Sequence, residues 1–271
     1  MAGESAASNG PTTEILYAKD GHVATIVLNR PQRGNALTPT MHAAIGGIWN
    51  EVQEDDDVRV LIITGAGERH FSTGADVDVI AERGRVTQGS GPLATEVFWS
   101  PRNAHVLKPI ICAVNGLCAG AGLHFVADAD IVLASSNASF MDTHVNVGMV
   151  GGVENTALAY RLPLGSVMRM TLLGREYRMP VTRAYQLGLV DEIFESDQLM
   201  QAAREMATTI AANSPAAVQR SKQAVWQSRE VGYSHAVEYG WAMVRMHWAH
   251  PDFREGPRAF REKRSPDWAD Q

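Results

Sequence analysis

The sequence is poor in cysteine, in long apolar runs and in excess positive charge. Only two cysteines, Cys112 and Cys118, occur in 271 residues, and both lie in an apolar stretch. Cysteines in an apolar stretch are usually small buried residues without a disulfide, as in proteins of a reducing compartment. No Cys/His pair has the spacing of a metal site, so we expect no metal.

No apolar run approaches the roughly 18–20 residues that a membrane-spanning helix needs. The net charge of −6 argues against a nucleic-acid partner. Residues 1–12 lack the basic start and apolar core of a signal peptide and have the composition of a disordered tail. We therefore expect a cytoplasmic protein that binds neither membrane nor nucleic acid.

What the chain does contain is typical of a folded globular protein, with 45% hydrophobic and 20% charged residues. In the first two thirds, strand-like and helix-like patterns alternate, which predicts an α/β fold. Thr38 is a helix cap followed by Pro39 at the first helical position. The predicted elements are a hairpin of Glu14–Lys19 and His22–Asn29, a helix from Thr38 to about Glu54, strands Val58–Thr64, Ile110–Val114 and Ile131–Ser135, and a helix Ala121–Ala127.

The last third of the chain has a different character, because helical periodicity replaces the alternation. We predict three helices there, over Ser196–Asn213, Pro215–Arg229 and Tyr233–His250. They are rich in tryptophan and methionine, which favours a helical subdomain that folds over the core and joins subunits. The predicted organisation is a tail at 1–12, a core at 13–195 and a helical region at 196–271.

The stretch from Lys108 to Asp130 combines a strand, a turn and Gly120-Ala121-Gly122 at the head of a helix. Small residues at this point let backbone N–H groups approach a ligand, and the helix dipole favours an oxygen that gains negative charge. An equally acceptable interpretation is that the glycines only permit tight packing. A second such stretch, HFSTGADVD at His70–Asp78, follows another predicted strand.

Together with LNRPQRGNAL (Leu28–Leu37), LLGRE (Leu172–Glu176) and DFREGPRAFREKR (Asp252–Arg264), these two stretches make the chain resemble the crotonase, or enoyl-CoA hydratase/isomerase, family. The resemblance extends from about Thr13 to Trp268. It implies a spiral of ββα turns followed by a helical trimerisation region, and a homotrimer or a hexamer built from two trimers. It also implies metabolism of acyl-CoA thioesters, as in fatty acid metabolism.

In this family, two backbone N–H groups polarise a thioester carbonyl and stabilise the resulting oxyanion. The resemblance places these donors at Ala75 and Ala121, and it implies that coenzyme A is part of the substrate and that no separate cofactor is needed. The residues that it implies for substrate binding are Arg33, Ala36, Ser72, Gly74, Asp76, Val77 and Gly120. In the same way, Phe98 and Trp99 are candidates for the acyl pocket, or else ordinary core aromatics.

The acid–base positions depart from the family pattern, because His124 and His144 stand where typical hydratases carry two glutamates. A histidine with a pKa near ~6.5 is a competent proton carrier at neutral pH. Alternatively, either histidine is a buried core residue. Asp142 and Glu154 are possible acid partners: Asp142 is two residues before His144, which on a strand means the same face.

These observations predict an acyl-CoA thioester enzyme of the hydratase/isomerase type, a lyase or isomerase, in which His124 or His144 carries the proton. A second hypothesis is a hydrolase of the same fold that cleaves β-diketone carbon–carbon bonds or thioesters, with Glu154 as the acid beside His144. A third is a non-catalytic paralogue that binds acyl-CoA.

Overall fold

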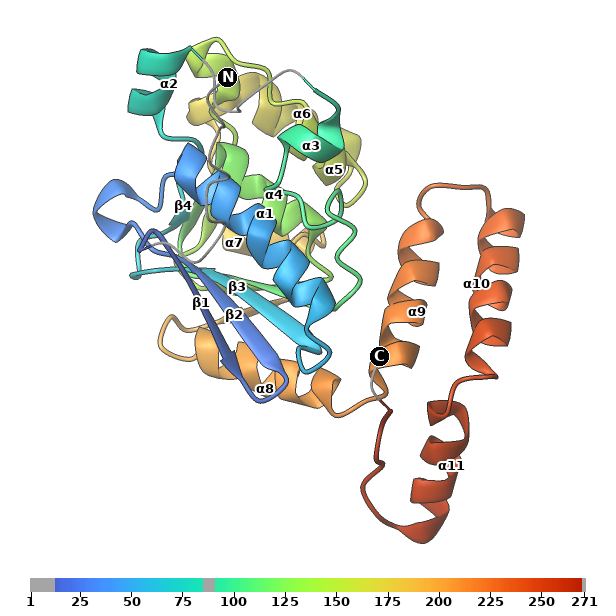
Figure 1. Ribbon diagram of the computed structural model, residues 1–271. Helices are drawn as coiled ribbons and strands as arrows, with labels where there is room; N and C mark the ends of the chain where they lie inside the picture. The colour runs from blue at the N-terminus through green and yellow to red at the C-terminus, as the bar shows by residue number, and fades with distance from the viewer. Residues whose placement is uncertain (1–12, 85–90, 270–271) are drawn as a thin grey trace, which may run out of the picture.

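Two β-sheets organise the protein in a computed structural model that describes residues 13–84 and 91–269 (Figure 1). The larger sheet has the strand order β1-β2-β3-β5-β7-β10, and the smaller sheet has the order β4-β6-β8-β9. The larger sheet consists of β1 (Ile15–Asp20), β2 (Val23–Leu28), β3 (Val60–Gly65), β5 (Ile110–Val114), β7 (Ile131–Ser135) and β10 (Glu192–Phe194). The smaller sheet consists of β4 (His70–Ser72), β6 (Leu117–Ala119), β8 (Ser139–Met141) and β9 (Met179–Pro180).

Helices cover the sheets and form a separate arm at the C-terminal end (Figure 1). The α-helices are α1 (Pro39–Glu54), α2 (Val77–Arg83), α3 (Leu93–Glu96), α4 (Leu123–Asp128), α5 (Val153–Ala159), α6 (Leu164–Leu173), α7 (Val181–Gln186), α8 (Leu199–Ala211), α9 (Pro215–Gln227), α10 (Tyr233–His247) and α11 (Asp252–Glu262). Short 3-10 turns are η1 (Pro31–Arg33), η2 (Gly120–Gly122), η3 (His144–Val147) and η4 (Gly174–Glu176). Within the described ranges, no helix has both the length and the apolar character needed to span a bilayer.

The predicted α/β class is confirmed, and several predicted elements match closely. The bounds of β5 and β7 are as predicted, and the side chain of Thr38 accepts a hydrogen bond from the Met41 N–H at the start of α1. The helix predicted from Ala121 is wrong in its first residues. Gly120–Gly122 forms a 3-10 turn, and α4 begins at Leu123. The 3-10 turn tightens the chain where it leaves β6.

Apolar side chains on both faces of the larger sheet hold the layers together. On one face, α1 buries Ile45, Ile48 and Trp49 at helical spacing. On the opposite face, α8 packs its small residues, such as Ala203, against β3. Full burial of each large apolar side chain contributes about 1.5–3 kcal/mol. The boundary predicted between 195 and 196 stays a prediction, although α8 packs on the sheet while α9–α11 project from it.

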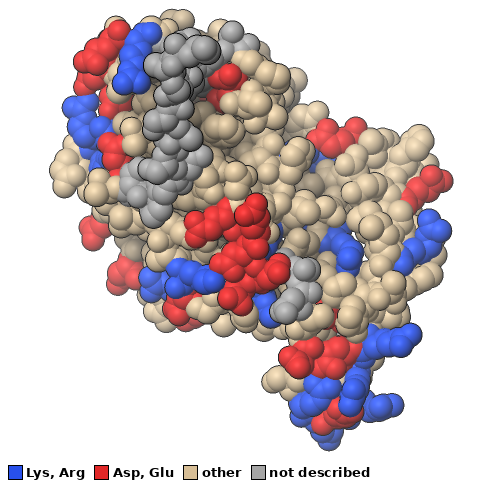
Figure 2. Space-filling model, in the orientation of Figure 1, with Lys and Arg blue, Asp and Glu red and all other residues tan. Residues whose placement is uncertain are grey.

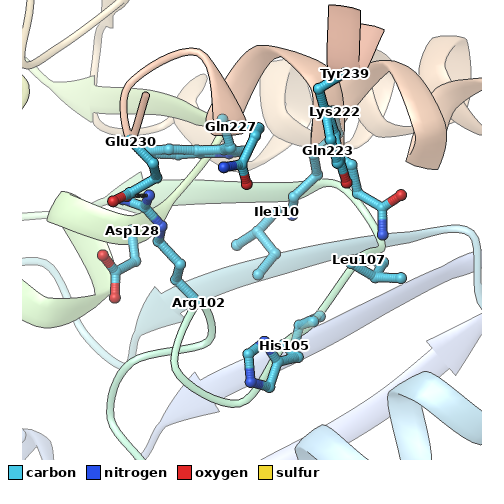
Figure 3. A pocket seen from close by; sticks show the side chains of 12 residues that line it. Arg102, His105, Leu107, Ile110, Asp128, Lys222, Gln223, Gln227, Glu230 and Tyr239 are labelled. Atoms are coloured by element: carbon cyan, nitrogen blue, oxygen red, sulfur yellow. Dashed lines mark hydrogen bonds and ion pairs between the residues drawn. The ribbon is translucent and has the colours of Figure 1, made fainter. Parts of the chain in front are cut away.

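Helix α9 is fastened to the core by polar contacts around a cavity of about 220 Å³ (Figure 3). The Lys222 ammonium lies 2.7 Å from the Asp130 carboxylate, which also accepts a hydrogen bond of 2.6 Å from the Trp226 indole. Arg102 lies over the Trp226 ring at 4.5 Å and pairs with Glu230. Because Lys222, Asp130, Arg102 and Glu230 already have partners, we interpret the cavity as part of the interface between α9 and the core.

Charged side chains are unevenly distributed on the face seen in Figure 2. Acidic side chains gather over the end of α1, where the sequence has Asp55, Asp56 and Asp57, whereas acidic and basic side chains lie mixed over α11. In Figure 1, α11 lies at the opposite end of the molecule from α4 and α5. The charged side chains on α11 are therefore distant, within one chain, from the site described next.

Candidate active site

Two Gly-Ala segments come together at the ends of neighbouring parallel strands, β4 and β6. Ser72 pairs with Cys118 in the register of these strands, so Gly74-Ala75 and Gly120-Ala121 leave the sheet side by side. Gly74 has a φ of +88°, and a Cβ there would lie 3.0 Å from the Ala119 carbonyl oxygen and 3.2 Å from the Ala121 nitrogen. A side chain at position 74 would therefore push the two segments apart.

The peptide groups around Ala75 are held by Leu37 from a third segment. The Leu37 N–H donates to the Gly74 oxygen at 2.8 Å, and the Asp76 N–H donates to the Leu37 oxygen at 2.9 Å. In the described part of the chain, we find no backbone acceptor for the Ala75 N–H. The Ala121 N–H lies in the first turn of η2, where N–H groups have no partner inside the helix. Both amides are thus free to meet an external oxygen.

A cluster of histidine and carboxylate side chains lies next to these segments. The Nδ1 atom of His144 is 2.5 Å from Asp142 Oδ1, and its Nε2 atom is 3.0 Å from Glu154 Oε1. His124 belongs to the same cluster, since its Nε2 atom is 3.4 Å from Glu154 Oε2. The structure therefore brings together all four residues that the sequence singled out as acid–base candidates.

The cluster borders the backbone segments directly. A Cβ on Gly120, which has a φ of +50°, would lie 3.7 Å from His144 Cε1 and 3.7 Å from the Gly74 Cα. His124 lies one helical turn after Ala121 in the chain. One site therefore holds the two free amides and the polar cluster.

The reason given above for the Asp142–His144 contact is wrong, although the contact exists. Strand β8 ends at Met141, and His144 starts the 3-10 turn η3, so the two residues do not share a strand face. They meet because the chain turns between them: the Asp142 carboxylate accepts from the His144 N–H at 3.0 Å as well as pairing with its ring. Asp and Asn side chains commonly bind a backbone N–H two residues ahead in this way.

Asn155 and Gly151 complete the cluster, and neither is among the residues predicted from the sequence. The Asn155 amide donates to Asp142 Oδ2 at 2.6 Å, so both oxygens of the fully buried Asp142 accept hydrogen bonds. A Cβ on Gly151 would lie 2.6 Å from Asn155 Nδ2, 2.8 Å from Asp142 Oδ2 and 3.0 Å from His144 Nδ1. Only the position of Asn155 next to Glu154 on α5 hinted that it shares this environment.

The buried groups of the cluster differ in proton affinity. Burial, together with the neighbouring His144 and His42, lowers the pKa of His124 to about 3. Burial also acts to lower the pKa of His144, but Asp142 and Glu154 outweigh it and raise that pKa. Burial raises the pKa of Glu154, and the charge on His144 partly offsets this. His124 is therefore neutral at neutral pH, whereas the pKa of His144 lies above its usual value because of the two carboxylates.

We expect the free energy of unfolding to depend less on pH, in the acid range, when His124 is replaced by glutamine. Because its pKa is lowered in the folded state, the unfolded chain binds more protons at His124 between pH ~6.5 and ~3, and the wild-type protein loses stability as pH falls through this range. The glutamine variant lacks this loss. Urea unfolding at pH 7 and pH 5 measures it, with the exposed His235→Gln as control. An equal slope in wild type and His124→Gln would contradict a neutral buried His124.

The residues predicted to bind the substrate are dispersed around the two amides, and several have structural partners. Ser72 is buried, and its hydroxyl donates to the Asn35 oxygen at 3.0 Å and accepts from Gly74 N–H at 3.2 Å. Asp76 caps α2 and lies 2.9 Å from the Arg30 guanidinium. Arg33 is exposed and pairs with Asp78.

The remaining predicted substrate contacts differ in exposure. Ala36 is buried, whereas Val77 is 57% exposed. Of the two candidates for the acyl pocket, Trp99 is buried against Phe125 in the core. Phe98 stacks on His42 with ring centroids 4.9 Å apart. Trp99 is therefore a core residue by its contacts. Phe98 is only partly buried and remains the candidate for the acyl pocket.

The other carboxylates near the site have different partners. Asp128 is buried and accepts a hydrogen bond from the Ser100 hydroxyl. Within the described residues, no group of three or more His, Cys, Asp or Glu side chains is arranged to hold a metal ion. The titratable side chains that lie together beside the two amides are therefore His124, Asp142, His144 and Glu154.

Comparison with known proteins agrees with this architecture. The sequence profile of the enoyl-CoA hydratase/isomerase family matches residues 18–271, so the chain belongs to this family. It is 34% identical to the (E)-benzylidenesuccinyl-CoA hydratase of Thauera aromatica over 93% of this chain and 97% of that protein. It is 32% identical to the short-chain-enoyl-CoA hydratase of Clostridium acetobutylicum over 92% and 95% of the two chains.

Solved structures show the same fold. An enoyl-CoA hydratase/isomerase from Mycobacterium paratuberculosis superposes with a TM-score of 0.85 at 39% identity, over 94% of this chain and 98% of that one. An enoyl-CoA hydratase from Mycobacterium tuberculosis H37Rv gives a TM-score of 0.86 at 28% identity, over 95% and 99%. The chain thus has the crotonase fold, and it is an enzyme of the hydratase/isomerase type.

Proposed function

We propose that the protein acts on an enoyl-CoA thioester, with the N–H groups of Ala75 and Ala121 binding the thioester carbonyl oxygen. The observation that carries this proposal is the close approach of the two segments: a Cβ added to Gly74 would lie 3.2 Å from the Ala121 nitrogen, and no backbone acceptor is found for the Ala75 N–H among the described residues. Removal of one such donor costs about 2.7–4 kcal/mol of transition-state stabilisation in other enzymes.

The reaction that fits these groups is addition of water across the 2,3 double bond. The water oxygen bonds to C3, a proton leaves the water for the polar cluster, and the π electrons move to the thioester oxygen as an enolate. The two amides stabilise that oxygen. The enolate then collapses, and a proton from the cluster bonds to C2. The sum is one water added, or one water removed in the reverse direction.

Activity on a panel of short, long and cyclic 2-enoyl-CoA thioesters tests the proposal. Wild-type protein is assayed beside a variant with His124→Glu and His144→Glu together, which carries two carboxylates at these positions. Hydration by the wild type supports the proposal. Hydration by the double variant alone means that the scaffold binds the thioester but that the natural reaction is another one. No hydration by either protein would contradict it.

Hydrolysis is the second candidate, because the His144–Asp142 pair at 2.5 Å resembles the base–acid pairs that activate water or a nucleophile. Hydrolysis of a thioester would release a free thiol, and cleavage of a cyclic β-diketone would yield a carboxylic acid. A thiol-reactive dye and mass spectrometry distinguish both products from a hydroxyacyl-CoA. Binding of the thioesters without any turnover would instead favour the non-catalytic paralogue.

We further propose that the C-terminal helices join three copies of the chain, alone or as two stacked trimers. Exposed apolar side chains on these helices support this, because such patches mark interaction sites. They are Val237, Trp241, Val244, Met246 and Trp248 on and just after α10, and Phe253 and Phe260 on α11.

Replacing Trp241 by glutamate is therefore expected to reduce the solution mass. The side chain is 51% exposed and stacks edge-on against Trp248 at 5.3 Å, so a charge there would be buried in an interface. Light scattering should give about three or six times 29.4 kDa for the wild type and a lower mass for the variant. Leu16→Glu on β1, with 46% exposure far from α10, is the control. A wild-type mass of 29.4 kDa would contradict the oligomer.

A further inference from the structure

His144 is enclosed by carboxylates at both ring nitrogens. Asp142 lies 2.5 Å from Nδ1, and Glu154 lies 3.0 Å from Nε2. A neutral imidazole carries one N–H and one lone pair, whereas the protonated ring carries two N–H groups. A lone pair on Nδ1 would face Asp142 and be repelled, so Nδ1 carries an N–H, and the negative charge of Glu154 near Nε2 favours a second proton on the ring. The two carboxylates therefore favour an imidazolium, Asp142 through its hydrogen bond with Nδ1 and Glu154 through its charge near Nε2.

We propose that His144 is a permanently protonated positioning residue, and that Glu154 is the group that takes and returns the proton in the proposed reaction. The assignment rests on the proposed function for the reaction itself. It reverses the roles expected from the sequence, in which histidine carried the proton and the acids oriented it.

Glu154 has an oxygen available for this task. Its side chain is buried, and Oε1 has no aligned hydrogen bond among the described residues even though His144 Nε2 lies 3.0 Å away. The contact is therefore an ion pair off the N–H direction, and Oε1 keeps a lone pair for another donor. The other oxygen, Oε2, lies 3.4 Å from His124 Nε2.

The groups that face His144 and Glu154 from each neighbouring element favour this charge distribution. Asp142, from the turn after β8, is the second carboxylate on His144, and Asn155 of α5 binds its far oxygen at 2.6 Å. His124 of α4 is neutral, and His42 of α1 also has a lowered pKa because it is buried. The cluster thus holds two carboxylates, one cation and neutral polar groups.

In the hydration step, Glu154 accepts one proton as the water oxygen bonds to C3 and the π electrons move to the thioester oxygen. The resulting carboxylic acid then gives that proton to C2, and the enolate electrons form the C2–H bond. His144 keeps its two protons throughout. The sum is again one water added.

Nitrogen-15 NMR of labelled histidine tests the protonation of His144 without any substrate. The His144 signals are assigned by their loss in His144→Gln. We expect two protonated ring nitrogens at pH 7 in the wild type. Glu154→Gln should lower the pKa of His144, because it removes one of the charges that raise it, and the exposed Glu176→Gln should not. A neutral His144 at pH 7 would overturn the proposal.

Kinetics on a thioester that the wild type converts test the role of Glu154. Glu154→Gln should lose at least 100-fold in kcat/KM at every pH, whereas Glu176→Gln should match the wild type. His144→Gln should regain activity at alkaline pH, because Glu154 without its cation ionises at higher pH. If His144→Gln is inactive at every pH while Glu154→Gln keeps more than a tenth of the activity, His144 is the base and the proposal fails.

The NMR and kinetic experiments distinguish a failure of the proposed function from a failure of the proposed role of His144. Two protonated nitrogens on His144, together with no turnover of any thioester, would contradict the proposed function and support the charge distribution in the cluster. Turnover with a neutral His144 would support the function and overturn the assignment made here.

Discussion

Replacing Gly151 with alanine should lower kcat/KM by about 100-fold or more while the protein remains folded. The added methyl group would lie 2.6 Å from Asn155 Nδ2, 2.8 Å from Asp142 Oδ2 and 3.0 Å from His144 Nδ1. The first two distances are shorter than those of real Cβ atoms and the third is unusually tight, so the Asn155 and Asp142 side chains must move and the His144 ring must give way slightly. Displacement of a catalytic group by about 1 Å costs on the order of 10²-fold in rate.

The adjacent glycine provides a matched control for this substitution. A Cβ on Gly152 would have only Val150 Cγ1 nearby, at 3.7 Å, and the φ of Gly152 is −99°. Gly152→Ala should therefore keep wild-type kcat/KM. Steady-state kinetics, with circular dichroism to verify folding, compares the two variants. Similar kcat/KM values for Gly151→Ala and Gly152→Ala would show that the activity does not depend on close packing of the cluster against position 151.

The elements that the sequence predicted well are those whose pattern is local. Thr38 followed by Pro39 marks a helix start, and the run Ile110–Val114 is apolar because β5 is buried on both faces. The start of α4 was misplaced, because Gly120–Gly122 forms a tighter turn that depends on packing against Gly74. That contact joins residues 46 positions apart, and no local pattern records it.

In the site, too, the residues that could be predicted are those that a local sequence pattern marks. His124 and His144 were identified from motif positions, and Glu154 and Asp142 from being acids near them in the chain. Asn155 could not be identified, because its role depends on α5 lying against the turn after β8. The charge on His144 could not be inferred either, since it depends on two carboxylates that reach opposite sides of one ring.

Asp142→Asn is expected to lower kcat/KM at pH 7 by about 100-fold or more; the same change in a Ser-His-Asp triad lowers kcat by about 10⁴. Asp142 is fully buried. Its carboxylate accepts hydrogen bonds from the His144 backbone N–H at 3.0 Å and from the Asn155 side-chain amide at 2.6 Å, and it lies 2.5 Å from Nδ1 of the His144 ring. An asparagine supplies one acceptor oxygen and one donor group. Its donor would therefore face another donor, and His144 would lose a charge that raises its pKa.

The same variant should change how stability depends on pH. Burial alone would raise the pKa of Asp142, but the hydrogen bonds from His144 and Asn155 outweigh it and lower that pKa. A lowered pKa means that the carboxylate stabilises the fold above its unfolded pKa, near ~3.9, and that this contribution is lost as pH falls through the folded pKa. Urea unfolding should show a larger loss for Asp142→Asn at pH 7 than at pH 3.

Asp128→Asn is the control, because Asp128 is also a buried acid but accepts a hydrogen bond from Ser100 instead of pairing with His144. Burial raises the pKa of Asp128, so removing its charge should cost less stability at pH 7 than removing that of Asp142. Activity close to wild type in Asp128→Asn, beside a loss of 10² or more in Asp142→Asn, would assign the effect to the pairing with His144. Equal losses in the two variants would mean that any buried charge matters and that the pairing itself does not.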